Sequence, residues 1–207
     1  MSQQVVLITG ALTGIGRATA LAFAIDGTRI VVSGRHDEAG LALAGELRGL
    51  GAEAEFIRAD VRREDEVRNL VDQAVARFGR LDIAVNNAGT EGKPGPVTDI
   101  TEAGYVAMMA LYAGSKHAVE GITKSAAIEA AAYGVRVNAV APGPTETGML
   151  DRLTGSPEKK AAFYAAIPLK RGGTAQEVAD AIQFVASAKA AFITGQIIRV
   201  NGGKTAS

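Results

Sequence analysis

The chain has 207 residues, of which 47% are apolar, so it is long enough to bury a substantial core as one domain spanning residues 1–207. Its 22 basic residues balance its 22 acidic residues, and this absence of net charge argues against nucleic acid or an anionic membrane as a partner. The lack of Cys excludes disulfides, and two distant His residues, His36 and His117, predict no metal site.

The N-terminal residues lead directly into the run QQVVLITG, without the basic and long apolar segments of a secretion signal. No apolar run in the chain approaches the roughly 18 residues that a membrane-spanning helix needs. We therefore expect a cytoplasmic protein whose partner is a small molecule.

Short β-branched runs alternate with longer Ala- and Leu-rich amphipathic stretches along the chain. The predicted strands, six in all, cover residues 4–9, 28–33, 53–59, 81–86, 135–141 and 195–200. The predicted helices cover residues 14–26, 37–50, 62–78, 112–133 and 174–187. This alternation is typical of βαβ units and predicts an α/β fold with a parallel sheet covered on both faces.

Four glycines stand where predicted helices end, each at a position suited to the left-handed conformation of a helix cap. They are Gly27, Gly51, Gly79 and Gly134. Between residues 142 and 173 four prolines interrupt the chain, so we expect only one or two short helices there.

The first predicted strand runs into TGALTGIG, which places Gly10, Gly14 and Gly16 at the opening of a helix. Glycines at this position let the backbone approach a pyrophosphate, whose charge is met by free N–H groups and the helix dipole. The spacing differs from the usual G-x-G-x-x-G, and a tight strand-to-helix turn without a ligand is the alternative interpretation.

Five motifs occur in one order and span nearly the whole chain: TGALTGIG at 9–16, NNAG at 86–89, YAGSK at 112–116, APGPTET at 141–147 and ITGQIIRVNGG at 193–203. Together they resemble the short-chain dehydrogenase/reductase family. The resemblance implies a Rossmann-like doubly wound parallel sheet in a single domain. It also implies hydride transfer between a nicotinamide dinucleotide and an alcohol or carbonyl substrate, often within a homotetramer.

The resemblance implies catalytic roles for Tyr112 and Lys116. The cofactor-binding residues that it implies are Gly10, Thr13, Gly14, Ile15, Gly16, Arg35, Asp60, Val61, Asn87, Ala88, Gly89, Tyr112, Lys116, Pro142, Gly143, Thr145 and Thr147.

Three of these residues bear on the adenosine end of the cofactor. Asp60 and the backbone amide of Val61 resemble the pair that contacts adenine, although an Asp before a helix is also an ordinary N-cap. Arg35, where an NAD enzyme would carry an acidic residue, suits a 2′-phosphate by charge and geometry. Since Arg35 could instead be a solvated side chain stacked on adenine, NADP is favoured and NAD stays open.

The remaining pairs lie later in the chain. Tyr112 and Lys116 stand four residues apart, on one face of a helix, where the ammonium lowers the phenol pKa from its reference of about 10. Thr145 and Thr147 resemble the hydroxyls that meet the carboxamide and phosphates of the cofactor. A Pro-rich loop with a helix cap is the alternative for the two threonines.

The stretch between NNAG and YAGSK is short. Only residues 90–111 lie between Gly89 and Tyr112, whereas the family places a helix, a fifth strand with the catalytic Ser, and a loop there. Only residues 99–111 look helical, no apolar strand follows them, and the stretch contains no Ser. The chain therefore resembles a family member from which one helix–strand unit is missing. A natural loss, an engineered deletion and an incompletely recorded sequence would look the same.

Losing a central strand removes about 5–12 kcal/mol of apolar burial, against a total domain stability of about 5–15 kcal/mol. Either the strand beginning at Val135 moves about 4.8 Å to pair with residues 81–86, or the fold is marginal and has two exposed sheet edges. Both outcomes put efficient turnover and the family's oligomer in doubt. We expect an NAD(P)-dependent oxidoreductase of impaired activity, and the alternative is a non-catalytic dinucleotide-binding or interaction protein.

Overall fold

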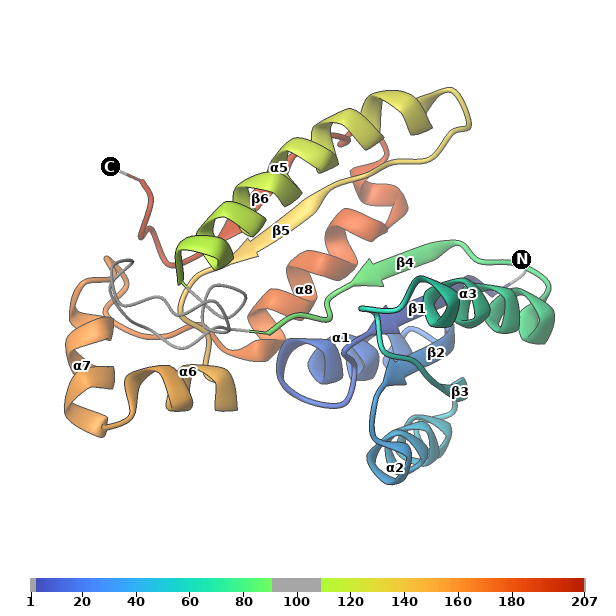
Figure 1. The fold of residues 1–207 in the computed structure, drawn as a ribbon, viewed down its shortest axis with the longest axis horizontal. Helices are drawn as coiled ribbons and strands as arrows, with labels where there is room; N and C mark the ends of the chain where they lie inside the picture. The colour runs from blue at the N-terminus through green and yellow to red at the C-terminus, as the bar shows by residue number, and fades with distance from the viewer. Residues whose placement is uncertain (1–2, 91–108, 207) are drawn as a thin grey trace. The chain divides into compact units, whose positions relative to one another are not determined.

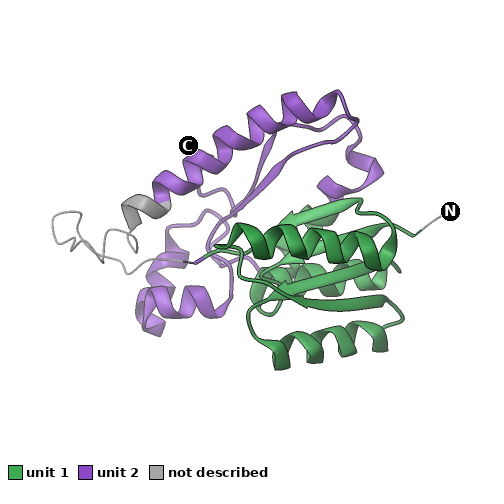
Figure 2. Ribbon diagram, turned by 45° about the vertical axis from the view of Figure 1, so that its right-hand side comes forward, with its two compact units in different colours: residues 1–89, 175–183 green, residues 90–174, 184–207 purple. Residues whose placement is uncertain are grey.

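The computed structural model describes residues 3–90 and 109–206, apart from the side chains of 109–112. The chain divides into two compact units, which are described separately (Figure 2). Unit 1 holds residues 1–89 and 175–183, and unit 2 holds residues 90–174 and 184–207. The single domain expected from the sequence stays a prediction.

Unit 1 is a parallel α/β layer structure (Figure 1). Its four strands are β1 (Val5–Thr9), β2 (Arg29–Gly34), β3 (Glu53–Arg58) and β4 (Ile83–Asn86), in the order β3-β2-β1-β4. The helices between them are α1 (Gly14–Ile25), α2 (Asp37–Gly49) and α3 (Glu64–Phe78). Both neighbours of β1 run parallel to it, with Val6 opposite Ile30 on one side and Ile83 on the other.

The core of unit 1 forms because its strands are apolar on both faces. All five residues of β1 are buried, and so are four of the six residues of β2. On one face Val5 and Leu7 pack with Leu70 and Phe78 of α3 in a single cluster. The strands therefore bury both faces, as the continuous apolar runs predict.

Unit 2 contains a two-stranded parallel sheet, β5 (Ala139–Pro142) beside β6 (Ile197–Val200). Its other elements are α5 (Met109–Ala131), α6 (Gly148–Thr154), α7 (Pro157–Ala165) and the 3-10 helix η2 (Ala188–Ala190). α8 (Ala175–Ala186) begins in unit 1, where Gln183 donates a hydrogen bond of 3.0 Å to Asp26, and ends in unit 2.

Within the described residues the predicted α/β class, the six strands and the two short helices after Pro142 are confirmed. All four predicted cap glycines have positive φ, from 69° at Gly27 to 93° at Gly51. The strand predicted at 135–141 begins only at Ala139, because before it only one backbone hydrogen bond, from Gly195 N to Val137 O at 2.7 Å, remains and side chains supply the others. Thr194 Oγ1 accepts from Val137 N, and Asn138 Oδ1 accepts from Gln196 N.

The described strands form two sheets, one in each unit. β4 pairs with β1 and β5 pairs with β6, and no ladder among the described residues joins β4 to β5. Ala84 and Asn86 of β4 are exposed and Ile83 and Val85 only half-buried, unlike the buried residues of β1. Because β4 and β5 lie in different units, which of the two outcomes considered above applies stays a prediction.

Among the described helices, none combines the length and the apolarity that crossing a bilayer requires.

Candidate cofactor and active site

The turn after β1 is built by two glycines with positive φ, Gly10 at 63° and Gly14 at 55°. A Cβ on Gly10 would lie 2.7 Å from Ala88 Cα, and a Cβ on Gly16 would lie 2.3 Å from the carbonyl oxygen of Gly10. The three glycines of TGALTGIG are thus required by backbone geometry and by close approach, as the motif predicts.

The amides of this turn are available to a ligand. The backbone N–H groups of residues 12–16 donate no hydrogen bond to any described part of the chain. Thr13 occupies the N-cap position of α1, but its side chain forms no capping hydrogen bond, and the first turn contains no acidic residue. Free amides at the positive end of a helix dipole form an anion site, so these residues fit a diphosphate.

Hydrogen bonds from the NNAG segment, residues 86–89, connect this turn to the end of β4. Asn87 Nδ2 donates to the carbonyl oxygens of Thr9 and Gly10, both at 3.1 Å, and Ala88 N donates to Thr9 Oγ1 at 3.2 Å. The sequence predicted Asn87 and Ala88 as cofactor-binding residues. The contacts described here hold the glycine turn in place, and Thr9 takes part in them although it was not predicted.

The loop after β3 carries Asp60 and Val61. Val61 is exposed, and its backbone N–H has no partner among the described residues, so it is available as a donor. Asp60 does not cap α3, because the helix begins at Glu64 and Arg63 is its N-cap residue. The capping alternative for Asp60 is therefore wrong.

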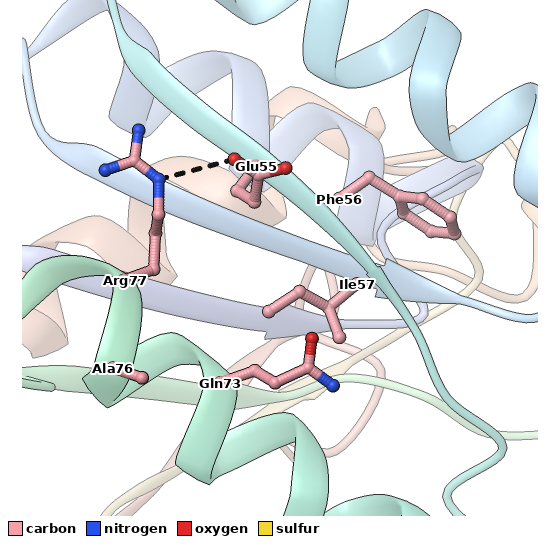
Figure 3. A pocket seen from close by; sticks show the side chains of 6 residues that line it. All are labelled: Glu55, Phe56, Ile57, Gln73, Ala76 and Arg77. Atoms are coloured by element: carbon pink, nitrogen blue, oxygen red, sulfur yellow. Dashed lines mark hydrogen bonds and ion pairs between the residues drawn. The ribbon is translucent and has the colours of Figure 1, made fainter.

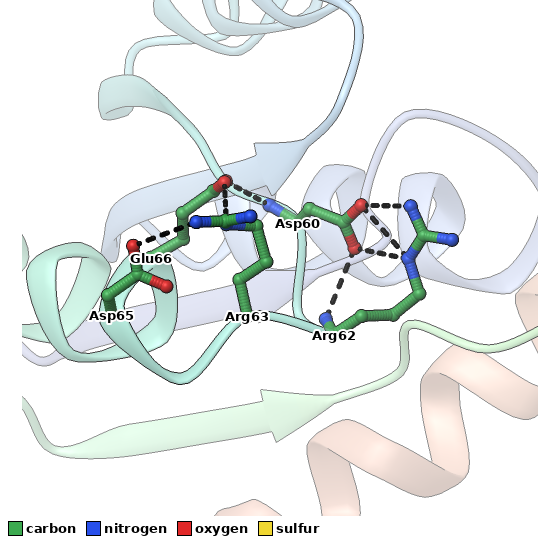
Figure 4. A network of polar contacts seen from close by, with 5 residues as sticks. All are labelled: Asp60, Arg62, Arg63, Asp65 and Glu66. Atoms are coloured by element: carbon green, nitrogen blue, oxygen red, sulfur yellow. Dashed lines mark hydrogen bonds and ion pairs between the residues drawn. The ribbon is translucent and has the colours of Figure 1, made fainter.

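The Asp60 carboxylate binds Arg62 instead. Arg62 Nε lies 3.0 Å from each carboxylate oxygen, and Arg62 N donates to Oδ1 at 3.1 Å (Figure 4). These hydrogen bonds from Arg62, aided by the charges of Arg62 and Arg35 and opposed by burial, hold the pKa of Asp60 well below its usual 3.8. Asp60 is thus a carboxylate at any physiological pH. Arg35 itself is exposed.

Tyr112 and Lys116 both lie on α5, as predicted. Lys116 is exposed. The Tyr112 side chain lies outside the described residues, so the contact between the phenol and the ammonium stays a prediction.

The turn at 142–147 packs against the end of β6. Gly143 N donates to Val200 O at 2.8 Å, and a Cβ on Gly143 would lie 2.7 Å from Asn201 Cα. Thr145 Oγ1 donates to Gly143 O at 3.0 Å, and Thr147 Oγ1 to Thr145 O at 3.3 Å. Thr147 is the N-cap residue of α6, but its side chain makes no capping hydrogen bond. The hydroxyls stabilise the turn and do not cap the helix.

The predicted site residues thus fall into two groups. Those of the glycine turn, the NNAG segment and the loops after β2 and β3 share unit 1, and those from Tyr112 to Thr147 share unit 2. Sequence reasoning missed Thr9, Arg62 and Asn201. Arg62 directly follows the Asp-Val pair, and this adjacency is the one signal that could have identified it.

The structure also contains a hollow that lies apart from the predicted site residues. A shallow hollow of about 490 Å³ lies between β3 and α3, where Arg77 and Glu55 form an ion pair of 3.5 Å (Figure 3). None of the predicted site residues lines it. Within the part of the chain that the structure describes, no three His, Asp or Glu side chains are grouped to bind a metal ion.

Known proteins match the chain along its whole length. Residues 4–110 match the model of the short chain dehydrogenase family, and residues 104–205 match that of enoyl-(acyl carrier protein) reductase. Glucose 1-dehydrogenase of Gluconobacter oxydans is 34% identical, over 97% of this chain and 91% of its own. 3-Oxoacyl-[acyl-carrier-protein] reductase of Synechocystis is 36% identical, over 98% of this chain and 97% of its own.

The solved structures agree with these matches. Actinorhodin polyketide ketoreductase, crystallised with NADPH, superposes with a TM-score of 0.90 at 29% identity, over 98% of this chain and 97% of its own. This chain therefore belongs to the short-chain dehydrogenase/reductase family, whose members are NAD(P)-dependent oxidoreductases.

Proposed function

We propose that this oxidoreductase binds NADP(H) and interconverts a small alcohol and its carbonyl compound slowly. Tyr112 is the acid/base, and Lys116 lowers the phenol pKa and holds the nicotinamide ribose. The proposal rests most directly on one observation, the unpartnered amides of residues 12–16 at the uncapped start of α1. A turn that only joined a strand to a helix would gain by satisfying those donors.

The preference for NADP(H) follows from Arg35 at the end of β2. Its guanidinium is exposed, and no carboxylate of the described residues forms an ion pair with it. A forked cation without a partner suits a phosphate. The NADPH in the actinorhodin ketoreductase crystal supports the same choice.

Each protein group has a defined task in the proposed reaction. The coenzyme, when bound, supplies or accepts the hydride. Tyr112 gives a proton to the carbonyl oxygen in reduction and takes it back in oxidation, and the nearby ammonium of Lys116 stabilises the phenolate between these steps. Thr145 and Thr147 orient the nicotinamide end.

Slow turnover follows from the short stretch at 90–111. The alignment with glucose 1-dehydrogenase runs over 243 positions, more than the 207 residues of this chain, so that relative carries residues without a counterpart here. The two family models meet at residues 104–110, within this stretch. A missing hydroxyl donor costs about 100-fold or more in rate, and a displacement of about 1 Å of a reacting group costs a similar factor.

Two measurements on the full chain test the proposal. Fluorescence titration gives the Kd for NADPH, and NADPH oxidation is then followed with a panel of small ketones and aldehydes. We expect binding, slow turnover, and a loss of about 100-fold or more in turnover in Tyr112→Phe without a change in Kd. Tyr133→Phe, at an exposed tyrosine that follows α5, is the matched control and should keep full turnover.

The outcomes separate the two functions. Turnover that survives in Tyr112→Phe contradicts the assigned chemistry. Binding without any turnover favours the non-catalytic dinucleotide-binding protein instead. That alternative is supported by the sheet of unit 1, which ends at β4 in the described structure.

A further inference from the structure

Arg62 occupies the Asp60 carboxylate, which the family resemblance assigns to adenine. An ionised carboxylate has about four acceptor positions. Arg62 supplies four hydrogen bonds to Asp60, three from its guanidinium and one from its backbone N–H. The Asp60 side chain is only 14% exposed, whereas that of Arg62 is 75% exposed, so the partner that can leave is Arg62.

The other charges of this loop are paired among themselves. Glu66 Oε1 lies 3.0 Å from Arg63 Nε, and Glu66 Oε2 accepts from Asp60 N at 2.8 Å. Asp65 lies 3.4 Å from Arg63 as well. In Figure 4, Glu66 and Asp65 point toward Arg63, while Arg62 lies on the other side of Asp60. Arg62 is therefore the partner that neutralises the Asp60 carboxylate.

Arg35 follows β2 where Asp60 follows β3, and the two strand ends are joined, because Gly34 pairs with Arg58 and Ala59 N donates to Gly34 O at 3.1 Å. The charge of Arg35 accordingly makes the smallest contribution to lowering the pKa of Asp60. Arg35 nevertheless has no ion pair with any described carboxylate. Arg62 therefore binds the Asp60 carboxylate directly, whereas Arg35 acts on it only through its charge. If Arg62 were absent, the charge of Asp60 would attract Arg35 and oppose a phosphate placed beside it.

We infer that Arg62 determines coenzyme specificity: by neutralising Asp60 it keeps the Arg35 guanidinium available for a 2′-phosphate and so favours NADPH over NADH. This inference rests on the proposed function, because it requires that a nicotinamide coenzyme binds at the glycine turn. Arg62 is a positioning residue in this account, since it acts through Asp60 and Arg35.

The test is the ratio of the Kd for NADH to the Kd for NADPH, measured by fluorescence titration of the full chain. Loss of stability affects both coenzymes alike and cancels in this ratio. In Arg62→Ala we expect the ratio to fall by about 3- to 10-fold, the effect of one unscreened charge near the protein surface. Arg62→Lys keeps the positive charge, so its ratio should stay close to that of the wild-type chain.

A double variant separates neutralisation from any other role. Adding Asp60→Asn to Arg62→Ala removes the unpaired carboxylate, so the ratio should return to about the value of Asp60→Asn alone. Arg68→Ala is the control, because Arg68 is an exposed arginine on α3 that pairs only with Glu64 among the described residues. It should leave the ratio unchanged. In 1 M salt the effect of Arg62→Ala should shrink, because charges are screened over about 3 Å.

Each remaining outcome contradicts a defined claim. A wild-type chain that binds neither coenzyme overturns the proposed function and this inference together. A wild-type chain that binds NADPH, with an unchanged ratio in Arg62→Ala or an equal fall in Arg68→Ala, overturns the inference alone. A fall in the ratio that Asp60→Asn does not reverse shows that Arg62 does not act through Asp60.

Discussion

The two units differ in how completely they bury their own elements. In unit 1 every residue of β1 is buried and α1 buries six residues. In unit 2, α5 is 23 residues long, yet Thr123 and Ala127 are its only buried side chains among those described. Ile122 and Ile128 of α5 are 65% and 79% exposed. Unit 2 as described thus leaves apolar side chains of α5 uncovered.

This difference separates coenzyme binding from chemistry. The proposed phosphate contacts of unit 1, and the adenine contacts that the resemblance implies, come from loops that a buried sheet positions. The proposed catalytic pair lies on a helix that buries little of its surface. We therefore expect changes at the glycine turn of unit 1 to weaken coenzyme binding most, and changes in the packing of unit 2 to lower stability while binding persists.

The largest expected effect is that of Gly16→Val. Its Cβ would lie 2.3 Å from Gly10 O and 2.5 Å from Asn87 Nδ2, so the turn must open. We predict that the Kd for NADPH rises by about 100-fold or more, because the amides lose their shared orientation. Gly45→Ala in α2 is the control. Its Cβ meets nothing within 4 Å, so binding should be unchanged and stability equal or slightly higher.

Arg136→Ala tests unit 2. The Arg136 guanidinium donates hydrogen bonds of 2.8–3.2 Å to the carbonyl oxygens of Val185, Ala186, Ser187 and Ile193. It therefore satisfies carbonyl groups at the C-terminal end of α8 that have no partner within the helix. Its removal should lower the free energy of unfolding by about 2–4 kcal/mol, measured by urea denaturation, with little change in the Kd for NADPH. Arg199→Ala, which breaks an exposed pair of 3.4 Å with Glu120, should cost far less. Equal effects of the two variants would contradict the capping role of Arg136.

A smaller effect is expected for Asn87→Ala. This change removes the two hydrogen bonds, of 3.1 Å each, that join NNAG to the glycine turn. We predict a loss of about 1–3 kcal/mol in the free energy of unfolding and a Kd for NADPH raised about tenfold. Calorimetric unfolding with and without NADPH measures both. A stability loss without weaker binding would show that the turn keeps its form without Asn87.

The smallest expected effect concerns pH. The pKa of Asp60 is lowered in the folded chain, so its ion pair stabilises the fold above the unfolded pKa of about 3.9 and loses this contribution as pH falls below that value. In Arg62→Ala the pKa of Asp60 should rise toward 3.8, and stability should depend less steeply on pH below about 4. NMR titration of the carboxyl carbon measures the pKa directly. An unchanged pKa would contradict the role of Arg62.

Local patterns predicted much of this fold. The positions of the strands followed from apolar runs, and Gly27, Gly51, Gly79 and Gly134 marked helix ends because left-handed φ favours glycine. Contacts between distant segments could not be predicted. The approach of Gly16 to Asn87 and the support of the turn by Thr9 depend on β4 lying beside β1, which the sequence does not display. The sequence likewise does not decide which strand pairs with residues 81–86 across the shortened stretch.

Isothermal titration calorimetry of the full chain with NADPH tests the central claim most directly. We predict heat of binding at one site per chain, with a signal that Gly16→Val abolishes and Gly45→Ala preserves. The absence of heat with both NADPH and NADH would contradict it.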